Sequence, residues 1–329
     1  MVAGLLFVTV LAHADGGLVL KIATVAPDGT PWSSGLVLFK EMVERDTAGR
    51  VTVRPFLGGV LGDENETVLA CQRGQIQGVG ASTGAIASVV PELNVLELPY
   101  AFRSAEEADY ILDTVVLTTI EEAFAKRGLV FGFWSENGYR SFGTNYGFVK
   151  SPADLKGHKM RSQESAVHLE MYRAFGASPV PIPVTEVLTS MQTGVIDGYD
   201  NTPLFALAAQ WTEVTKYYTL TDHIYQPAAI VFNKGWFDTL SATDQKVLMS
   251  ARTSVQVRMR KEIRALSPLL VANLSDMGVQ IYTPTVAEKA AFEVPAKAAR
   301  DKYLSTASAG EKALYEKISK GLVTYRASH

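Results

Sequence analysis

The sequence predicts an α/β fold organised as two lobes, and three observations support this prediction. The chain has 329 residues, which is enough for a large core in one compact unit or in two lobes. Its first part alternates strand-like and helical stretches, the pattern of a parallel sheet. A helix-to-strand device occurs twice, at Gln72-Arg73-Gly74 and at Gln192-Thr193-Gly194, 192 − 72 = 120 residues apart. In both copies the glycine stands where a helix C-cap is expected.

Residues 1–14 have the composition of a secretory signal peptide. Their apolar core ends in Ala12-His13-Ala14, an A-x-A type cleavage site, although no Lys or Arg precedes that core. We therefore expect export to the periplasm and cleavage after Ala14. No further apolar run of 18 residues occurs, so no membrane-spanning segment is expected in the mature chain.

The charge balance and the cysteine count argue against several classes of function. The chain has 31 basic and 34 acidic side chains, a net charge of −3 and no basic stripe, which argues against nucleic acid as a partner. The single cysteine, Cys71, permits no internal disulfide and lies in a helical stretch, where a small buried thiol is the ordinary interpretation. The five histidines lack metal-ligand spacing. We therefore expect no metal site and no cofactor.

The first lobe is predicted to begin with a strand at Leu18–Val25, followed by a helix from Pro31. A second strand is expected around Val51 and Val53, where apolar and polar residues alternate. The glycine-rich loop 57–64 lacks the Lys-Ser/Thr ending of a phosphate-binding P-loop, and a helix follows it.

Two hydroxyl-bearing residues of the first lobe are candidate ligand contacts. Ser82 and Thr83 lie just past the carboxyl end of the strand that follows Gly74, where open α/β sheets bind ligands. Their hydroxyl and backbone N–H groups could donate to a ligand. A plain turn is the equally simple alternative.

The middle of the chain continues the alternation of strands and helices. Leu93–Phe102 is predicted to be a buried strand, and Ser104 is predicted to cap a helix with Glu107 at the capping-box position. A strongly apolar strand is expected at Leu129–Trp134. Trp134 at its end either forms an apolar wall of a pocket or belongs to the core.

Two arginines stand at predicted strand ends and are candidates for binding an acid. Arg140, which follows Asn137, and Arg161 are each followed by small polar residues and flanked by turn formers. The guanidinium group suits a carboxylate because its planar fork offers two parallel N–H donors and stays charged at any working pH. The alternative is that each arginine forms a structural ion pair.

Four motifs occur in order from Trp134 onward. W-x-x-N-G-Y-R ends at Arg140, P-x-D-L-K-G-x-K-M-R ends at Arg161, G-A-S-P-V-P covers residues 176–181, and Q-T-G-V-I-D-G-Y-D-N ends at Asn201. In the order and spacing of these motifs the chain resembles the solute-binding proteins of TRAP transporters, the DctP-type extracytoplasmic receptors for organic acids.

The resemblance implies a type II-like periplasmic binding fold with hinge strands and a long helix that spans both lobes. In that family the arginine that matches Arg161 grips the ligand carboxylate, and the arginine that matches Arg140 assists. The asparagine that matches Asn201 completes the grip. Val184 falls where sialic-acid-binding members carry an aromatic contact, so sialic acid is disfavoured. No catalytic residue is expected, and the candidate ligand-binding residues are Arg161, Arg140, Asn201, Asn137, Trp134, Ser82, Thr83 and Val184.

The C-terminal part is predicted to supply the lobe-spanning helix, running from Ser241 to Gly278 with a kink at Pro268. A helix of about 35 residues would be roughly 50 Å long. We expect residues 15–138 plus 227–266 to form lobe I, and residues 139–226 plus 267–329 to form lobe II. The hinge is expected where two strands cross near residues 138 and 226.

These features predict a periplasmic receptor that binds a small carboxylate between two lobes and delivers it to TRAP membrane subunits. The resemblance implies a monomer, and we expect no enzyme, because the sequence contains no nucleophile–base pair, metal cluster or cofactor loop. The alternatives are a periplasmic enzyme acting on organic acids and a receptor for a sensor kinase. Whether the ligand is a monocarboxylate or a dicarboxylate stays open, because Arg140 can serve the same carboxylate as Arg161 or a second one.

Overall fold

The computed structural model describes residues 17–329, and the predicted signal peptide, residues 1–14, lies outside that range. Within it the strands form one nine-stranded sheet in the order β2-β1-β3-β8-β4-β7-β5-β6, with β9 beside β8. No helix of residues 17–329 combines the length and the apolar character needed to cross a membrane. The strands are β1 (Leu18–Ala23), β2 (Val51–Phe56), β3 (Gly78–Ser82), β4 (Leu129–Thr144), β5 (Lys159–Ser162), β6 (Ser178–Pro181), β7 (Gly198–Asn201), β8 (Tyr217–Asn233) and β9 (Gln280–Tyr282).

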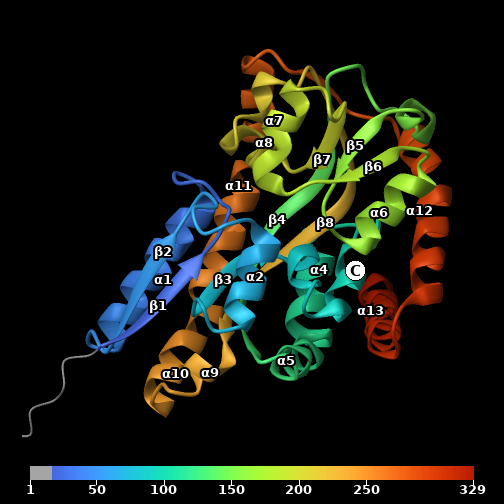
Figure 1. The fold of residues 1–329 in the computed structure, drawn as a ribbon. Coiled ribbons are helices and arrows are strands. Elements are labelled where there is room, and N and C mark those ends of the chain that lie inside the picture. The colour runs from blue at the N-terminus through green and yellow to red at the C-terminus, as the bar shows by residue number, and fades with distance from the viewer. Residues whose placement is uncertain (1–16) are drawn as a thin grey trace, which may run out of the picture.

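Helices and short helical turns connect the strands and cover the sheet (Figure 1). The α-helices are α1 (Pro31–Asp46), α2 (Glu64–Gln72), α3 (Thr83–Ile86), α4 (Ala105–Tyr110), α5 (Leu117–Ala125), α6 (Ala166–Ala174), α7 (Val187–Gln192), α8 (Pro203–Ala208), α9 (Lys234–Phe237), α10 (Ala242–Met249), α11 (Val255–Asp276), α12 (Val286–Thr306) and α13 (Ala309–Ser328). The shorter turns are η1 (Pro91–Glu97), η2 (Ile111–Val115), η3 (Pro152–Leu155), η4 (Val184–Glu186), η5 (Trp211–Glu213) and η6 (Ser250–Arg252).

The two halves of the sheet have equivalent arrangements of parallel and antiparallel strands. β1 pairs in parallel with β2 and β3, and β5 pairs in parallel with β6 and β7. β3 then runs antiparallel to β8, as β7 runs antiparallel to β4. Figure 1 shows β1–β3 in one half of the molecule and β5–β7 in the other, with β4 and β8 running between them. The prediction of a two-lobed α/β fold is confirmed.

The repeated helix-to-strand device is the clearest local sign of this symmetry. Gly74 follows α2 with φ of 75°, and Gly194 follows α7 with φ of 72°. Both angles lie in the left-handed region, which glycine enters without the steric cost that a Cβ atom brings. Each glycine ends its helix and turns the chain into the equivalent strand, β3 or β7.

Local sequence explains why α1 forms where it does. Thr30 caps the helix reciprocally with Ser33, Pro31 fills the first turn, and the face that bears Trp32, Leu36, Phe39 and Val43 is buried. α2 begins with a second capping box, formed by Asp63 and Glu66 at the end of the glycine-rich loop. Both helices therefore start at the carboxyl-end edge of the first-lobe strands.

The two long strands form the connection between the lobes. β4 and β8 pair antiparallel along most of their length, with Gly138 opposite Gln226. The pairing is interrupted by irregularities between Glu136 and Gly138 and between Arg140 and Phe142. Gly138 itself has φ of 97°. The prediction that strands cross near residues 138 and 226 agrees with this register.

The predicted strand at Leu93–Phe102 is wrong. Residues Pro91–Glu97 form the 3₁₀ turn η1, which packs on α3, β8 and α13 instead of joining the sheet. A short apolar run cannot by itself distinguish a buried strand from a buried helical turn. Pro91 at the first position and a hydrogen bond from the Asn94 side chain to the Pro91 carbonyl (3.1 Å) favour the turn.

The predicted single helix from Ser241 to Gly278 is also wrong, because the chain breaks it at residues 250–254 into α10, η6 and α11. The Ser250 and Thr253 hydroxyls bond back to backbone carbonyls at this point, which competes with the helical ladder. α11 keeps the predicted Pro268 inside it, and it contacts both α1 and α8. A helix of 22 residues, roughly 33 Å at 1.5 Å per residue, therefore spans the lobes.

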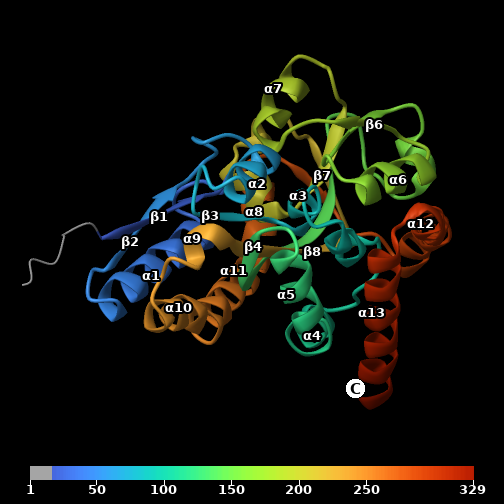
Figure 2. The same cartoon turned by 60° about the horizontal axis from the view of Figure 1, so that its bottom comes forward.

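The last two helices lie at one side of the molecule (Figure 2). α12 packs on α6, and α13 packs on η1 and α4. The chain thus returns from elements predicted for lobe II to elements predicted for lobe I before it ends.

Candidate functional site

A cavity of about 590 Å³, its open mouth included, lies between residues of the two lobes. It is bordered by the loop after β1, by β3, by the starts of α1 and α2, by the ends of β5 and β7, by α8, and by the middle of β4 and β8. The lining residues are Thr24, Val25, Ala26, Pro27, Thr30, Trp32, Glu64, Gly80, Ala81, Asn137, Arg140, Arg161, Gln163, Val184, Asn201, Thr202, Leu204, Phe205, Ala208 and Gln226. Five of the predicted ligand-binding residues are thus brought together: Arg161, Arg140, Asn201, Asn137 and Val184.

Arg161 reaches the cavity from β5 and is only 3% exposed. Its Nε atom donates to the carbonyl of Ile182 at 2.9 Å. Among residues 17–329 no acceptor bonds either of its terminal nitrogens, and no carboxylate pairs with it. Burial, together with the positive charge of Arg140, lowers the pKa of Arg161 to about 10. A buried guanidinium with two free terminal nitrogens and no counter-ion is a site that lacks an anion.

Arg140 has a different environment, although it lines the same cavity. Its Nε atom donates to Oδ2 of Asp200 at 2.6 Å, and its Nη2 donates to the backbone carbonyl of Asp200 at 2.5 Å. Nη1 donates to Oε1 of Gln226 at 2.8 Å. Burial alone would raise the pKa of Asp200, but the charge of Arg140 holds it well below its usual range. Arg140 therefore has the structural ion pair that the sequence left open as an alternative.

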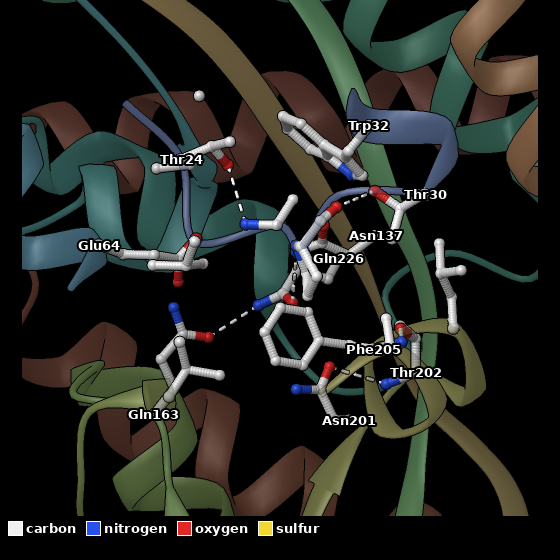
Figure 3. A pocket seen from close by; sticks show the side chains of 18 of the residues that line it. Thr24, Thr30, Trp32, Glu64, Asn137, Gln163, Asn201, Thr202, Phe205 and Gln226 are labelled. Atoms are coloured by element: carbon white, nitrogen blue, oxygen red, sulfur yellow. Dashed lines mark hydrogen bonds between the residues drawn. The ribbon is translucent and has the colours of Figure 1, made fainter. Parts of the chain in front are cut away.

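The side-chain amides of Asn137, Gln163 and Gln226 are joined by hydrogen bonds beside Arg140, and we call this group the amide wall. Oε1 of Gln226 accepts from Arg140 and from Nδ2 of Asn137 (3.0 Å), and its Nε2 donates to Oε2 of Glu97 and Oε1 of Gln163, both at 2.8 Å. All four hydrogen-bonding positions of the Gln226 amide are used, which fixes its orientation. Figure 3 shows the bond between Gln163 and Gln226 crossing the pocket wall.

Glu64 places a carboxyl group on the first-lobe side of the cavity. Its Oε1 accepts from the backbone N–H of Ser82 at 2.7 Å, and its Oε2 accepts from the Ser82 hydroxyl at 2.9 Å. Burial raises the pKa of Glu64. Ser82 and Thr83 do not line the cavity themselves: Ser82 supports Glu64, and the Thr83 hydroxyl bonds Glu97 (2.6 Å) and the Pro227 carbonyl (3.0 Å).

Trp134 belongs to the core and does not line the cavity. It is 1% exposed, its Nε1 donates to the Leu112 carbonyl at 3.3 Å, and its ring packs on Phe131 with centroids 4.5 Å apart. The aromatic walls are formed by Trp32 from α1 and Phe205 from α8, and Figure 3 shows both rings beside the pocket.

Asn201 lies at the end of β7 and retains a free donor. Its Oδ1 accepts from the backbone N–H of Thr202 at 2.8 Å, which aims the amide (Figure 3). Within residues 17–329, no protein acceptor bonds its Nδ2. The amide therefore faces the cavity with an N–H group available, on the same side of the sheet as Arg161.

Sequence reasoning missed several polar residues that build the site. Asp200 stands one position before Asn201 in the recognised motif, and Gln163 stands two positions after Arg161, so proximity to the motifs was the available signal. Glu97 had no signal because it was assigned to an apolar strand. His168, one of the five histidines without metal-ligand spacing, is fully buried, and its Nε2 lies 2.6 Å from Oε2 of Glu97.

Residues 17–329 contain no group of three or more His, Cys, Asp or Glu side chains arranged to hold a metal ion. Cys71 is a buried free thiol whose pKa is raised by burial, in agreement with the predicted inert role.

Comparison with known proteins gives consistent relatives. Residues 22–306 match the family model DctP, described as bacterial extracellular solute-binding protein, family 7. The chain is 38% identical over 213 residues to a solute-binding protein of Verminephrobacter eiseniae, a match that covers 65% of this chain and 64% of that one, slightly under two thirds of the relative. It is 30% identical over 246 residues to the 2,3-diketo-L-gulonate-binding periplasmic protein YiaO of Escherichia coli, covering 74% and 75% of the two chains.

Solved structures share the whole fold. A TRAP periplasmic solute-binding protein from Citrobacter koseri, with bound D-glucuronate, superimposes with a TM-score of 0.84 at 32% identity. The alignment covers 92% of this chain and 98% of that one.

Proposed function

The chain belongs to bacterial extracellular solute-binding protein family 7, and from this premise we propose that its cavity binds a hydroxylated monocarboxylate of the sugar-acid class. It is a solute receptor rather than an enzyme, as its family and its structural neighbours are. The observation that carries the proposal is the buried Arg161 with two free terminal nitrogens. A carboxylate placed there receives two parallel N–H···O bonds and supplies the missing counter-ion.

Asn201 supports this assignment. Its free Nδ2 group lies on the neighbouring strand β7, so it can donate to the same carboxylate. Three of the five N–H groups of Arg140 bond Asp200 and Gln226, which fixes the guanidinium beside the carboxylate position. Its charge still favours an anion nearby.

The charges of the cavity favour one carboxylate rather than two. Arg140 is neutralised by Asp200, which leaves Arg161 as the guanidinium without a counter-ion in the lining of this cavity. The opposite wall carries the carboxyl group of Glu64. A second ligand carboxylate would therefore lack a cation and would face an acid, whereas a hydroxyl group can donate to Glu64.

The remaining walls fit a compact ring or a short chain bearing hydroxyl groups. Trp32, Phe205 and Val184 offer apolar surface for C–H groups, while Thr24, Thr30 and the amides offer hydrogen-bonding atoms. The ligands of two relatives, D-glucuronate and 2,3-diketo-L-gulonate, are acids of this kind. Their similarity supports the class of ligand for this chain.

We infer that binding closes the lobes and that the loaded receptor docks on TRAP membrane subunits in the periplasm, acting as a monomer. Ligand contacts from both lobes would favour the closed state, because only that state offers all of them at once. We also propose the lobe boundaries given in the sequence analysis and cleavage of a signal peptide after Ala14. A sensor kinase as the partner remains the alternative, and neighbouring genes would decide between the two.

Thermal unfolding of the mature protein with a panel of acids tests the proposal. The panel contains D-glucuronate, D-galacturonate, 2,3-diketo-L-gulonate and succinate. A ligand at 100 times its Kd should stabilise the protein by about 2.7 kcal/mol, which is a rise of several degrees in Tm. A shift with a sugar acid and none with succinate is expected. Preferential stabilisation by succinate would overturn the monocarboxylate assignment, and no shift with any acid would overturn the receptor site itself.

A further inference from the structure

Two further cavities adjoin the binding cavity at α8. One, of about 930 Å³ with its open mouth included, lies between α8, α11, β4 and β8. The other, of about 830 Å³ measured in the same way, lies between α8, α11 and the loop before α1. Leu204 of α8 lines the binding cavity and both of its neighbours. A side chain that borders three cavities separates them, so Leu204 is part of a partition.

The other members of this partition are polar or small. Asn137 and Thr202 line the binding cavity and the larger neighbour, whereas Thr30 and Ala208 line the binding cavity and the smaller one. Hydrogen bonds hold the polar members, because Asn137 donates to Gln226 and the two threonines cap α1 and α8. Ala208 has no atom beyond Cβ. Leu204 is therefore the member whose side chain can be shortened without breaking a hydrogen bond.

Leu204 reaches from one lobe to the other. It stands in the first turn of α8, within the predicted lobe II, and its side chain packs against the apolar cluster that contains Trp32 and Phe133 of the predicted lobe I. The residue is half-buried, as expected for a side chain with cavities beside it. Because leucine has no polar side-chain atom, it can block a ligand only by its size.

The partition lies on the side of the cavity away from the Glu64 carboxyl group. Figure 3 shows Thr30 and Thr202 on one side of the pocket and Glu64 and Gln163 on the other. A ligand that fills the space between these two sides and carries a further group toward α8 meets the branched end of Leu204.

The space beyond Leu204 suits a second ring. The larger neighbouring cavity offers apolar surface from Ile263, Leu270 and Val271, and the side chains of Tyr139 and Tyr225 border it as well. Apolar and aromatic surface packs well against the C–H groups of a sugar or the face of an aromatic ring. The obstacle to a longer ligand is thus the partition and not the character of the space behind it.

We propose that Leu204 determines the length of the acids that this receptor accepts, by ending the binding cavity after one sugar unit. Acids that carry a second ring toward α8 are excluded because the branched side chain occupies the place where the two rings would join. The inference rests on the proposed function of the cavity, and it narrows the ligand class from sugar acids in general to those with a single unit.

Calorimetry with pairs of short and extended acids tests the inference. The pairs are D-glucuronate with phenyl β-D-glucuronide, and D-gluconate with lactobionate, which is gluconate carrying a galactose ring. In the unaltered protein the extended acid of a pair should bind about tenfold or more weakly than its short partner. Leu204→Ala removes the branched end of the side chain, so the ratio of the two Kd values should fall by about tenfold or more.

Leu207→Ala is the matched control. Leu207 is the same residue type on the same helix, is also half-buried, and lines the smaller neighbouring cavity but not the binding cavity. This variant should leave the ratio of the two Kd values unchanged. If Leu204 only packed the lobes together, Leu204→Ala would change both Kd values alike, so the ratio separates control of length from loss of packing.

The outcomes distinguish this inference from the receptor proposal. An extended acid that binds the unaltered protein as tightly as its short partner would overturn the role of Leu204 and leave the receptor intact. A ratio that Leu204→Ala does not change would do the same. If Leu204→Ala does not fold, Leu204→Val, whose side chain is one carbon shorter than leucine, should lower the ratio in the same direction, and an unchanged ratio there also overturns the inference. No binding of any acid, short or extended, would overturn the proposed function and this inference together.

Discussion

At the scale of single residues, two arginines of the same motif-rich region have opposite environments. Arg140 is held by Asp200 and Gln226, whereas the Arg161 side chain, among residues 17–329, bonds only the carbonyl of Ile182. From the sequence both were candidates for the ligand, because residue type and turn context are the same. The difference arises from partners that other segments supply.

Substitution of Arg161 should remove binding. Truncating a charge-paired arginine in a buried complex costs about 2–5 kcal/mol, so we expect Arg161→Ala to weaken affinity by roughly 30-fold to several thousand-fold. Arg161→Lys should also bind poorly, because an ammonium group cannot present two parallel donors. Calorimetry with the preferred acid measures both. Arg73→Ala, an exposed arginine at the end of α2, is the control and should bind normally.

The two arginines should also differ in what they do to the ligand-free protein. Arg140→Met leaves the Asp200 carboxylate buried without its partner, and we expect a loss of about 3–5 kcal/mol. Arg161→Met removes a buried charge that has no counter-ion, and we expect a gain of about 0.5–2 kcal/mol. Urea unfolding without ligand measures both changes. Equal destabilisation by the two variants would contradict the assigned roles.

At the scale of elements, β4 contains a backbone conformation at Gly138 that would be strained for any other residue. Gly138 has φ of 97°, and a Cβ atom added there would meet no other atom within 4 Å. The cost of a side chain at this position is therefore a backbone cost. It arises where β4 is irregular opposite Gln226, in the strand pair that joins the lobes.

We expect Gly138→Ala to fold and to lose about 1–2 kcal/mol of stability. Gly147→Ala is the matched control, since its site is equally open and its φ lies outside the left-handed region. That variant should be neutral or slightly stabilised, because alanine lowers the entropy of the unfolded chain. Thermal unfolding of both variants measures the difference, and the same Tm for both would argue against strain at Gly138.

The sequence predicted elements well where periodicity and caps agreed. The start of α1 and the glycine ends of α2 and α7 were readable from local residues. The errors came where local signals were ambiguous. The apolar run in Leu93–Phe102 suited a strand as well as a turn, and the hydroxyls near Ser250 broke a helix that was expected to continue to Gly278.

At the scale of the whole molecule, the site depends on contacts that no local pattern encodes. Asp200 and Arg140 are 60 positions apart, and Gln226 and Glu97 are 129 apart. The motifs singled out Arg161 and Asn201, and both line the cavity at the ends of β5 and β7. The charge partners, the amide wall and the aromatic walls could be identified only in the folded chain.

Acid should weaken the folded state through this long-range network. The pKa of Asp200 is lower in the folded chain than its ordinary value of 3.8, so its contribution to stability is present above about pH 4 and is lost as the pH falls through the folded-state pKa. We expect Asp200→Asn to be less stable than the unaltered protein at pH 7. The difference between the two should narrow below about pH 4. Urea unfolding at pH 7, 5 and 3 measures it, and a gap that widens in acid would contradict this sign.

The mirror-like strand order has a consequence for synthesis of the chain on the ribosome. β3, in the first half of the molecule, pairs with β8, which begins 217 − 82 = 135 residues after β3 ends. Until β8 has emerged, β3 presents an unpaired edge, and such edges invite pairing with other chains. The N-terminal half therefore cannot finish folding while it is being made, and this receptor reaches its native state only after most of its length has left the ribosome.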